Sequence, residues 1–272
     1  MIDWDDAFVN AVHVPPEERD PDRWAEVAAA FRDARPEGTF EVLTYGPRPR
    51  NALDLFHPAE EPRGLVVFVH GGYWHTLDRH YWSHLSQGAL AAGWSVAMPG
   101  YTLAPDATIT EITREVAAAI ECAAAKVKGP IRLIGHSAGG HLVARMACAD
   151  SPLAPDVLAR VRRIIPLSGV FDLLPLLGIK MNETLRLTPD EAAAESPARL
   201  AQGAEIPILL WVGANERPEF LRQTRLMSEA WRPGGRPLPQ RYDEGKNHFT
   251  VVSQLADPES ALNRALTRAL TD

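Results

Sequence analysis

The fold class of this chain is decided by one stretch, Ile131-Arg132-Leu133-Ile134-Gly135-His136-Ser137-Ala138-Gly139. A run typical of a buried strand leads into a G-x-S-x-G pentapeptide, and a segment compatible with a helix follows at residues 141–146. This strand-turn-helix context places the serine on a sharp turn that lifts its hydroxyl above a parallel sheet. Ser137 is therefore the candidate nucleophile, and a tight turn without chemistry is the weaker interpretation.

Apolar β-type runs alternate with helical patterns on both sides of this stretch, which is typical of parallel β/α units. Apolar residues recur at helical spacing from Ile112 to Val127, and again at Leu262, Leu266 and Leu270. The sequence therefore predicts an α/β fold whose central sheet is mostly parallel, has about eight strands and carries helices on both faces. The expected strands are residues 39–45, 52–56, 65–69, 94–98, 131–134, 164–167, 208–212 and 238–242.

The 272 residues fit a single domain, 1–272, because α/β folds of this length often have one core. One long connection, residues 168–205, breaks the rhythm of strands and helices and contains Pro175, Pro189 and Pro197. Connections of this length usually carry function or short helices of their own, so we expect a short cap insertion over the C-terminal edge of the sheet. An ordinary surface excursion is the alternative.

A serine hydroxyl needs a base that is itself oriented by an acid. His248 follows the last expected strand and, of the nine histidines, is the only one beyond the nucleophile's strand and helix. Glu216 follows the preceding strand, which fits the chain order serine, acid, histidine. The sequence thus predicts a triad of Ser137, Glu216 and His248. Three nearby carboxylates are rivals for the acid: Asp243, Glu244 and Glu219.

A second glycine-rich motif, His70-Gly71-Gly72-Tyr73-Trp74, follows the strand at residues 65–69. Glycines there let backbone N–H groups approach a substrate closely, as an oxyanion hole requires. We predict that the N–H groups of Gly72, Tyr73 and Ala138 form this hole, that Trp74 is an aromatic wall of the substrate site, and that His70 is structural. A glycine-rich turn that only reverses the chain is the alternative.

Composition excludes several classes of partner. Lys+Arg 28 against Asp+Glu 35 gives a net charge of −7, and no basic run stands out, so a nucleic acid or an anionic membrane surface is not expected. No apolar run approaches the roughly 18 residues of a spanning helix. The acidic start of the chain lacks the features of a secretory signal, which predicts a cytoplasmic protein. Cys122 and Cys148 are expected to be reduced thiols.

These motifs resemble the α/β-hydrolase superfamily, and within it the kynurenine formamidase (arylformamidase) and carboxylesterase group. Residues 70–74 are similar to the H-G-G-x-W loop of that group, residues 135–141 to its nucleophile elbow, and residues 168–173 to a segment after the sixth strand. Residues 216–223 read Glu-Arg-Pro-Glu-Phe-Leu-Arg-Gln. This segment resembles a D-S-P-E-F-x-R-Q-like stretch that begins with the catalytic acid, with Glu216 in place of Asp.

The resemblance implies the α/β-hydrolase fold and a serine hydrolase without a metal or cofactor, whose partner is a small-molecule substrate. That substrate would be a small aryl formamide, such as N-formylkynurenine, or an aryl or short-chain ester, and a general carboxylesterase is the alternative. An amino-acid substrate would need partners for its carboxylate and ammonium groups. Four charged residues are conceivable: Arg222, Lys180, Arg186 and Asp172. A homo-oligomer is compatible with the sequence but is not defined by it.

Three other functions compete with hydrolysis. His75, His80 and His84 cluster, and the last two are spaced i, i+4 as zinc ligands on a helix can be, but the segment lacks the Glu of a metalloprotease. A non-catalytic binding module is disfavoured because all three triad residue types occur in order. Transfer of the acyl group to an alcohol or thiol, in place of water, stays open.

Overall fold

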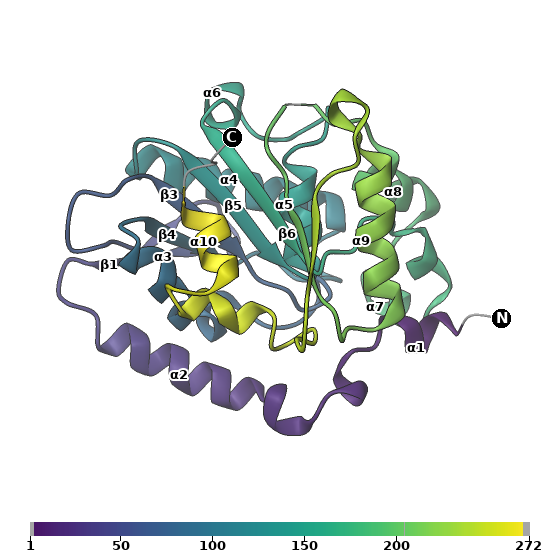
Figure 1. Cartoon of the computed structure of the whole chain (residues 1–272), viewed down its shortest axis with the longest axis horizontal. Helices are drawn as coiled ribbons and strands as arrows, with labels where there is room; N and C mark the ends of the chain where they lie inside the picture. Colours follow the sequence, from purple (N-terminus) through teal and green to yellow (C-terminus); the bar gives the residue numbers. More distant parts are fainter. Residues whose placement is uncertain (1–2, 204, 269–272) are drawn as a thin grey trace.

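The computed structural model describes residues 3–203 and 205–268 (Figure 1). Its strands are β1 Phe40–Thr44, β2 Ala52–Phe56, β3 Leu65–Val69, β4 Ser95–Pro99, β5 Ile131–His136, β6 Val161–Leu167, β7 Leu210–Gly213 and β8 Gln240–Asp243. They form one eight-stranded sheet in the order β1-β2-β4-β3-β5-β6-β7-β8. Only the pairings of β1 with β2 and of β2 with β4 are antiparallel. The predicted α/β class and mostly parallel sheet are confirmed.

Six of the eight strands differ from the prediction by one to three residues at one or both ends, and the late starts of two of them have identifiable reasons. The seventh strand begins at Leu210 and not at residue 208, because Pro207 precedes that residue and Ile208 makes only an isolated bridge to Ile164. The eighth begins at Gln240, because the backbone N–H of Leu238 donates to the carbonyl of Ser228, outside the sheet. Both late starts lie at the amino ends of the strands, on the side of the sheet opposite the candidate site.

Helices cover both faces of the sheet (Figure 1). They are α1 Trp4–Phe8, α2 Pro21–Asp33, α3 Gln87–Ala91, α4 Ile109–Lys126, α5 Ala138–Arg145, α6 Pro155–Leu158, α7 Asn182–Leu185, α8 Pro189–Ala194, α9 Pro218–Ala230 and α10 Ala261–Thr267. Successive strand residues point to opposite faces, so Val67 of β3 joins the core under α4, α5 and α9, whereas Phe68 joins the core under α3 and α10. The C-terminal helix is confirmed at Leu262 and Leu266, and Leu270 lies outside the described residues.

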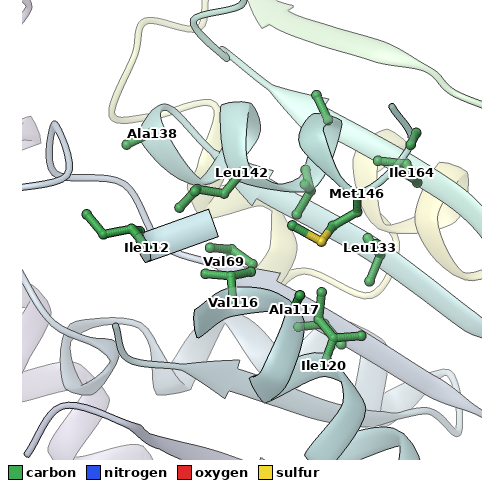
Figure 2. Packing of buried hydrophobic residues seen from close by; sticks show 14 of the residues in the cluster. Val69, Ile112, Val116, Ala117, Ile120, Leu133, Ala138, Leu142, Met146 and Ile164 are labelled. Atoms are coloured by element: carbon green, nitrogen blue, oxygen red, sulfur yellow. The ribbon is translucent and has the colours of Figure 1, made fainter. Parts of the chain in front are cut away.

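The larger core is built where α4 and α5 pack on the sheet (Figure 2). Helix α4 begins with a capping box between Thr108 and Glu111, and its predicted apolar stripe then faces the strands. Ile112, Val116 and Leu142 are fully buried there. This packing fixes α5, and with it the turn that precedes α5.

Four elements before the first strand form a segment that the hydrophobic pattern did not predict. They are α1, the 3₁₀ turns η1 Ala11–His13 and η2 Pro16–Glu18, and α2 (purple in Figure 1). Trp24 and Phe31 of α2 pack against the core that contains α3 and α10. The Asp20 carboxylate caps α2 by accepting the N–H groups of Asp22 and Arg23.

The remaining short elements are 3₁₀ turns: η3 Arg79–Tyr81, η4 Ser83–Ser86, η5 Leu174–Gly178, η6 Pro197–Arg199, η7 Pro233–Gly235 and η8 Val252–Ala256. Within residues 3–203 and 205–268, no helix is long and apolar enough to cross a membrane. The thiols of Cys122 and Cys148 are both free, and burial raises the pKa of Cys148 to about 11.

Candidate active site

Ser137 stands on a strained turn between β5 and α5. Its backbone has φ 57° and ψ −118°, a conformation that residues other than glycine rarely adopt. A Cβ atom on Gly139 would lie 2.0 Å from the carbonyl oxygen of Val69, and one on Gly135 would lie 2.1 Å from the carbonyl oxygen of Gly139. Both glycines are therefore required for steric reasons, and the turn places the serine at the carboxyl ends of the parallel strands.

Glu216 and His248 meet beside this turn. Nδ1 of His248 lies 2.7 Å from Oε2 of Glu216, and both side chains are almost completely buried. The other carboxylate oxygen, Oε1, accepts the backbone N–H of Gly213 at 2.8 Å and the hydroxyl of Ser168. Each oxygen of Glu216 thus has a fixed partner, and the carboxylate can hold the imidazole in one orientation.

The three rival carboxylates lie elsewhere. Asp243 accepts from the indole N–H of Trp211, Glu219 forms two bonds with Arg222, and Glu244 is exposed. Ser168, by contrast, is a contact of the acid that the sequence analysis did not identify. It follows β6 directly with φ 52°, and its N–H donates to the carbonyl of Trp211.

His136, next to the serine, is another contributor that the pattern did not single out. Its Nε2 lies 2.8 Å from the backbone carbonyl of His248. Burial, and next the charge of His248, lower the pKa of His136 well below its usual value. The neutral ring can therefore donate from Nε2 to that carbonyl, which fixes the backbone of the loop that carries His248.

The loop after β3 turns sharply against the nucleophile. Gly72, Tyr73 and Trp74 have φ of 115°, 51° and 59°, and the N–H groups of the next two residues, His75 and Thr76, both donate to the carbonyl of Gly72. A Cβ atom on Gly71 would lie 2.9 Å from Cβ of Ser137. The loop backbone thus runs directly beside the serine.

Ala138 is the first residue of α5, so its N–H is among those at a helix N-terminus without an intrahelical acceptor. His70 lies under the loop. It stacks on Tyr101 with ring centroids 4.3 Å apart, and burial lowers its pKa to about 4.

Ser137 and His248 line one cavity of about 270 Å³. Its wall is mostly aromatic and apolar, and the remaining lining residues are Ala11, Arg19, Pro21, Trp24, Gly71, Gly72, Tyr73, Thr76, Leu77, Trp82, His136 and Phe249. Trp24 stands between two other rings, with centroid distances of 5.1 Å to Trp82 and 5.8 Å to Phe249. A cavity of about 150 Å³ is enough to hold benzene, so this one has room for a ring with a short acyl group.

One expectation about the wall of this cavity is corrected. Trp74 is only 1% exposed and does not line it; its indole Nε1 donates to Nδ1 of His141 in the core, because the turn of the loop directs the side chain away from the serine. The cap expected at residues 168–205 stays a prediction, and none of its described residues is among the lining residues of this cavity. Residues 179–184 face an adjoining groove, together with α1.

The N-terminal segment covers the cavity. The hydroxyl of Tyr73 donates to the carbonyl of Phe8 at 2.7 Å, and the side-chain amide of Asn10 lies 3.3 Å from the same hydroxyl. Further along, Nδ2 of Asn247 donates to the carboxylate of Glu18 at 2.6 Å. The segment is thereby attached both to the loop after β3 and to the loop that carries His248.

The charged residues considered for a polar substrate do not line this cavity. Arg222 pairs with Glu219, Asp172 pairs with Arg199, and Lys180 lines the adjoining groove. Arg186 ends α7. The three histidines considered as metal ligands are also separated: His80 pairs with Asp78, and no three His, Cys, Asp or Glu side chains of the described residues gather as a metal site would require.

Comparisons with known proteins agree with this fold. The model of the alpha/beta hydrolase family matches residues 66–270. A kynurenine formamidase of Danio rerio is 28% identical over 243 residues, which is 85% of this chain and 82% of that protein.

Solved structures are similar as well. A crystal structure from a Silicibacter species, described provisionally as a thioesterase, superposes with a TM-score of 0.93 at 43% identity and covers 98% of this chain and 100% of that one. Esterase 2 of Thermogutta terrifontis, solved with butyrate bound, has a TM-score of 0.64 at 21% identity and covers 87% and 98%. At that identity the second likeness concerns the fold alone.

Proposed function

The chain belongs to the alpha/beta hydrolase family, and from that premise we propose that it is a serine hydrolase that cleaves a small aryl formamide or an aryl or short-chain ester through an acyl-enzyme on Ser137. The observation that carries the proposal is the single cavity in which Ser137 and His248 stand against aromatic rings. The hydrogen bond between Nδ1 of His248 and Glu216 supplies the oriented base that a serine nucleophile needs.

In this mechanism Nε2 of His248 takes the proton of Ser137 as Oγ attacks the formyl or acyl carbonyl. The carboxylate of Glu216 accepts a hydrogen bond from Nδ1–H of His248 and stabilises the imidazolium. The oxyanion is bound by the N–H groups of Gly72, Tyr73 and Ala138, each worth roughly 3 kcal/mol where water is excluded. His248 then protonates the departing aniline nitrogen or phenolate oxygen, and water hydrolyses the acyl-enzyme by the same route.

The cavity supports an aryl substrate. It has room for one substituted ring, and Trp24, Tyr73 and Phe249 are among its lining residues. The similarity to the Danio rerio kynurenine formamidase favours a formamide, and the similarity to the Silicibacter structure makes a thioester the second candidate. An anilide is a poor leaving group, so protonation by His248 matters most for the formamide.

The test is kcat/KM of the purified, chelator-treated protein for N-formylkynurenine, p-nitrophenyl acetate and an aryl thioacetate, with Ser137→Ala as the blank. A higher value for the formamide that disappears in the variant supports arylformamidase activity. Activity on the oxygen ester or the thioester alone assigns a carboxylesterase or a thioesterase. Inertness toward all three contradicts the proposal and favours the binding-module interpretation.

A further inference from the structure

Arg19 is the one permanently charged side chain among the described residues that line the cavity of Ser137. The two histidines there have other tasks, because His136 donates to the backbone of His248 and His248 pairs with Glu216. The side chain of Arg19 is half-buried in an otherwise apolar and aromatic wall. Its fixed positive charge is therefore available to an anion that enters the cavity.

No carboxylate of the described residues pairs with Arg19. Its Nε donates to the backbone carbonyl of Val14 at 3.0 Å, which holds the side chain along the N-terminal segment. The carboxylates of its sequence neighbours are engaged elsewhere: Glu18 accepts from Asn247, and Asp20 caps α2. The terminal nitrogens of the guanidinium are the remaining donors, and they can form the paired hydrogen bonds that a carboxylate accepts.

The position of Arg19 over the site is fixed from both sides. On one side Glu18 is bonded to Asn247, and on the other Trp24 stacks on Phe249. These two partners flank His248 in the sequence, so the segment that carries Arg19 is attached directly to the loop of the base. Such anchoring gives a binding residue a defined distance from the reacting carbonyl.

We propose that Arg19 binds a carboxylate on the substrate, so that the enzyme prefers aryl formamides or aryl esters that carry a carboxylate over neutral analogues of the same size. The proposal rests on the proposed function, because it places the ring of that substrate between Ser137 and Arg19. It adds a specificity residue from a segment that lies before the matched part of the family model.

The test compares 4-acetoxybenzoate with its neutral analogue 4-acetoxybenzamide. For the wild type we expect kcat/KM to be about tenfold higher for the benzoate, as one charge-assisted hydrogen bond gives. Arg19→Gln is expected to remove this preference, chiefly by raising KM for the benzoate. Arg23→Gln is the matched control, since Arg23 lies on the same segment, is 68% exposed and pairs with Glu26 outside the cavity.

A binding measurement separates this inference from the proposed function. Calorimetry of 4-acetoxybenzoate with the Ser137→Ala variant needs no turnover, and adding Arg19→Gln to that variant should weaken binding about tenfold. Unchanged binding, or an Arg19→Gln variant that loses activity on both esters in the same ratio, overturns the role of Arg19. Tight carboxylate-dependent binding without any hydrolysis by the wild type would instead overturn the proposed function and leave the role of Arg19 supported.

Discussion

At the scale of single residues, the orientation of His248 depends on the partners of the two carboxylate oxygens of Glu216. Oε1 is held by two donors, Gly213 and Ser168, so only Oε2 is left for the imidazole of His248. The orientation of His248 is therefore set by Gly213 and Ser168, which contact Glu216 but do not line the cavity. The sequence order of the triad predicts Glu216 but not Ser168, because nothing in a linear pattern shows which hydroxyl will meet a carboxylate 48 residues away.

Glu216→Gln tests this arrangement. The two donors bind the amide oxygen at the Oε1 position, so the NH₂ group faces Nδ1 of His248 and forces the proton onto Nε2. A ring with that tautomer cannot accept the serine proton, and kcat should fall on the order of 10⁴-fold while the fold is retained. Stopped-flow or steady-state assay with an aryl ester measures the loss.

Asp243→Asn is the control for that variant. Asp243 accepts from Trp211 and Gln254 and does not contact His248, so its kcat should stay within about twofold of the wild type. A damaging Asp243→Asn together with a harmless Glu216→Gln would show that the acid is wrongly assigned.

At the scale of elements, the turn between β5 and α5 has the tightest backbone packing of the site. A Cβ atom on Gly139 would overlap the carbonyl of Val69, which belongs to a paired strand and cannot retreat. Gly139→Ala should lower the free energy of unfolding by at least about 3 kcal/mol, measured by urea titration. Gly178→Ala, where no atom lies within 4 Å of the new Cβ, should change it by less than about 0.5 kcal/mol. Equal effects would contradict the packing of the elbow.

The N-terminal segment is the second element-scale feature, and Tyr73 connects it to the loop after β3. Tyr73→Phe removes the bonds to Phe8 and Asn10 while keeping the loop backbone. We expect kcat/KM for an aryl ester to fall about five- to tenfold, because a loss of about 1 kcal/mol loosens the cover of the cavity.

Tyr45→Phe provides the comparison for that variant. Its hydroxyl makes a similar bond, to the carbonyl of Gly100, outside the cavity. Thermal unfolding should show comparable losses for the two variants, but only Tyr73→Phe should lose activity. If Tyr45→Phe lowers kcat/KM equally, the effect reports general stability and not the attachment of the segment.

At the scale of the whole molecule, buried neutral histidines make stability depend on pH. Burial lowers the pKa of His70 and His84 to about 4 and that of His141 to about 3, whereas in the unfolded chain these groups titrate near about 6.5. Between those values the unfolded state binds more protons, so stability rises with pH in that window. The contribution is complete above about pH 6.5 and is lost on acidification.

Urea unfolding between pH 7.5 and 5.5 measures this dependence. We expect the free energy of unfolding to decrease below about pH 6.5, with a limiting slope of about 1.4 kcal/mol per pH unit for each histidine. His141→Gln should reduce the slope, since Nδ1 of His141 accepts the indole N–H of Trp74 and can do so only while the ring is neutral. A free energy that does not change between pH 6.5 and 5.5 would contradict the buried neutral state of these rings.

The architecture was largely predictable from the sequence, because strands such as β3 are continuous apolar runs and turns such as the one at Ser137 have strict steric requirements. The N-terminal segment that covers the cavity was not predictable in this way. Helix α2 has a weak apolar stripe, and the contact of Trp24 with Phe249 joins residues at opposite ends of the chain. Trp74 was misplaced for a related reason, since the positive φ of the loop determines which way the side chain points.

The mechanism requires Ser137 to be the nucleophile, and covalent labelling of its hydroxyl is the most direct test. The wild type would be treated with a p-nitrophenyl phosphonate and digested with trypsin, which releases residues 133–145, a peptide whose only hydroxyl side chain is that of Ser137. The account predicts one phosphonyl group per chain on this peptide and no labelling of Ser137→Ala. Equal labelling of the variant, or a label on another peptide of the wild type, would contradict it.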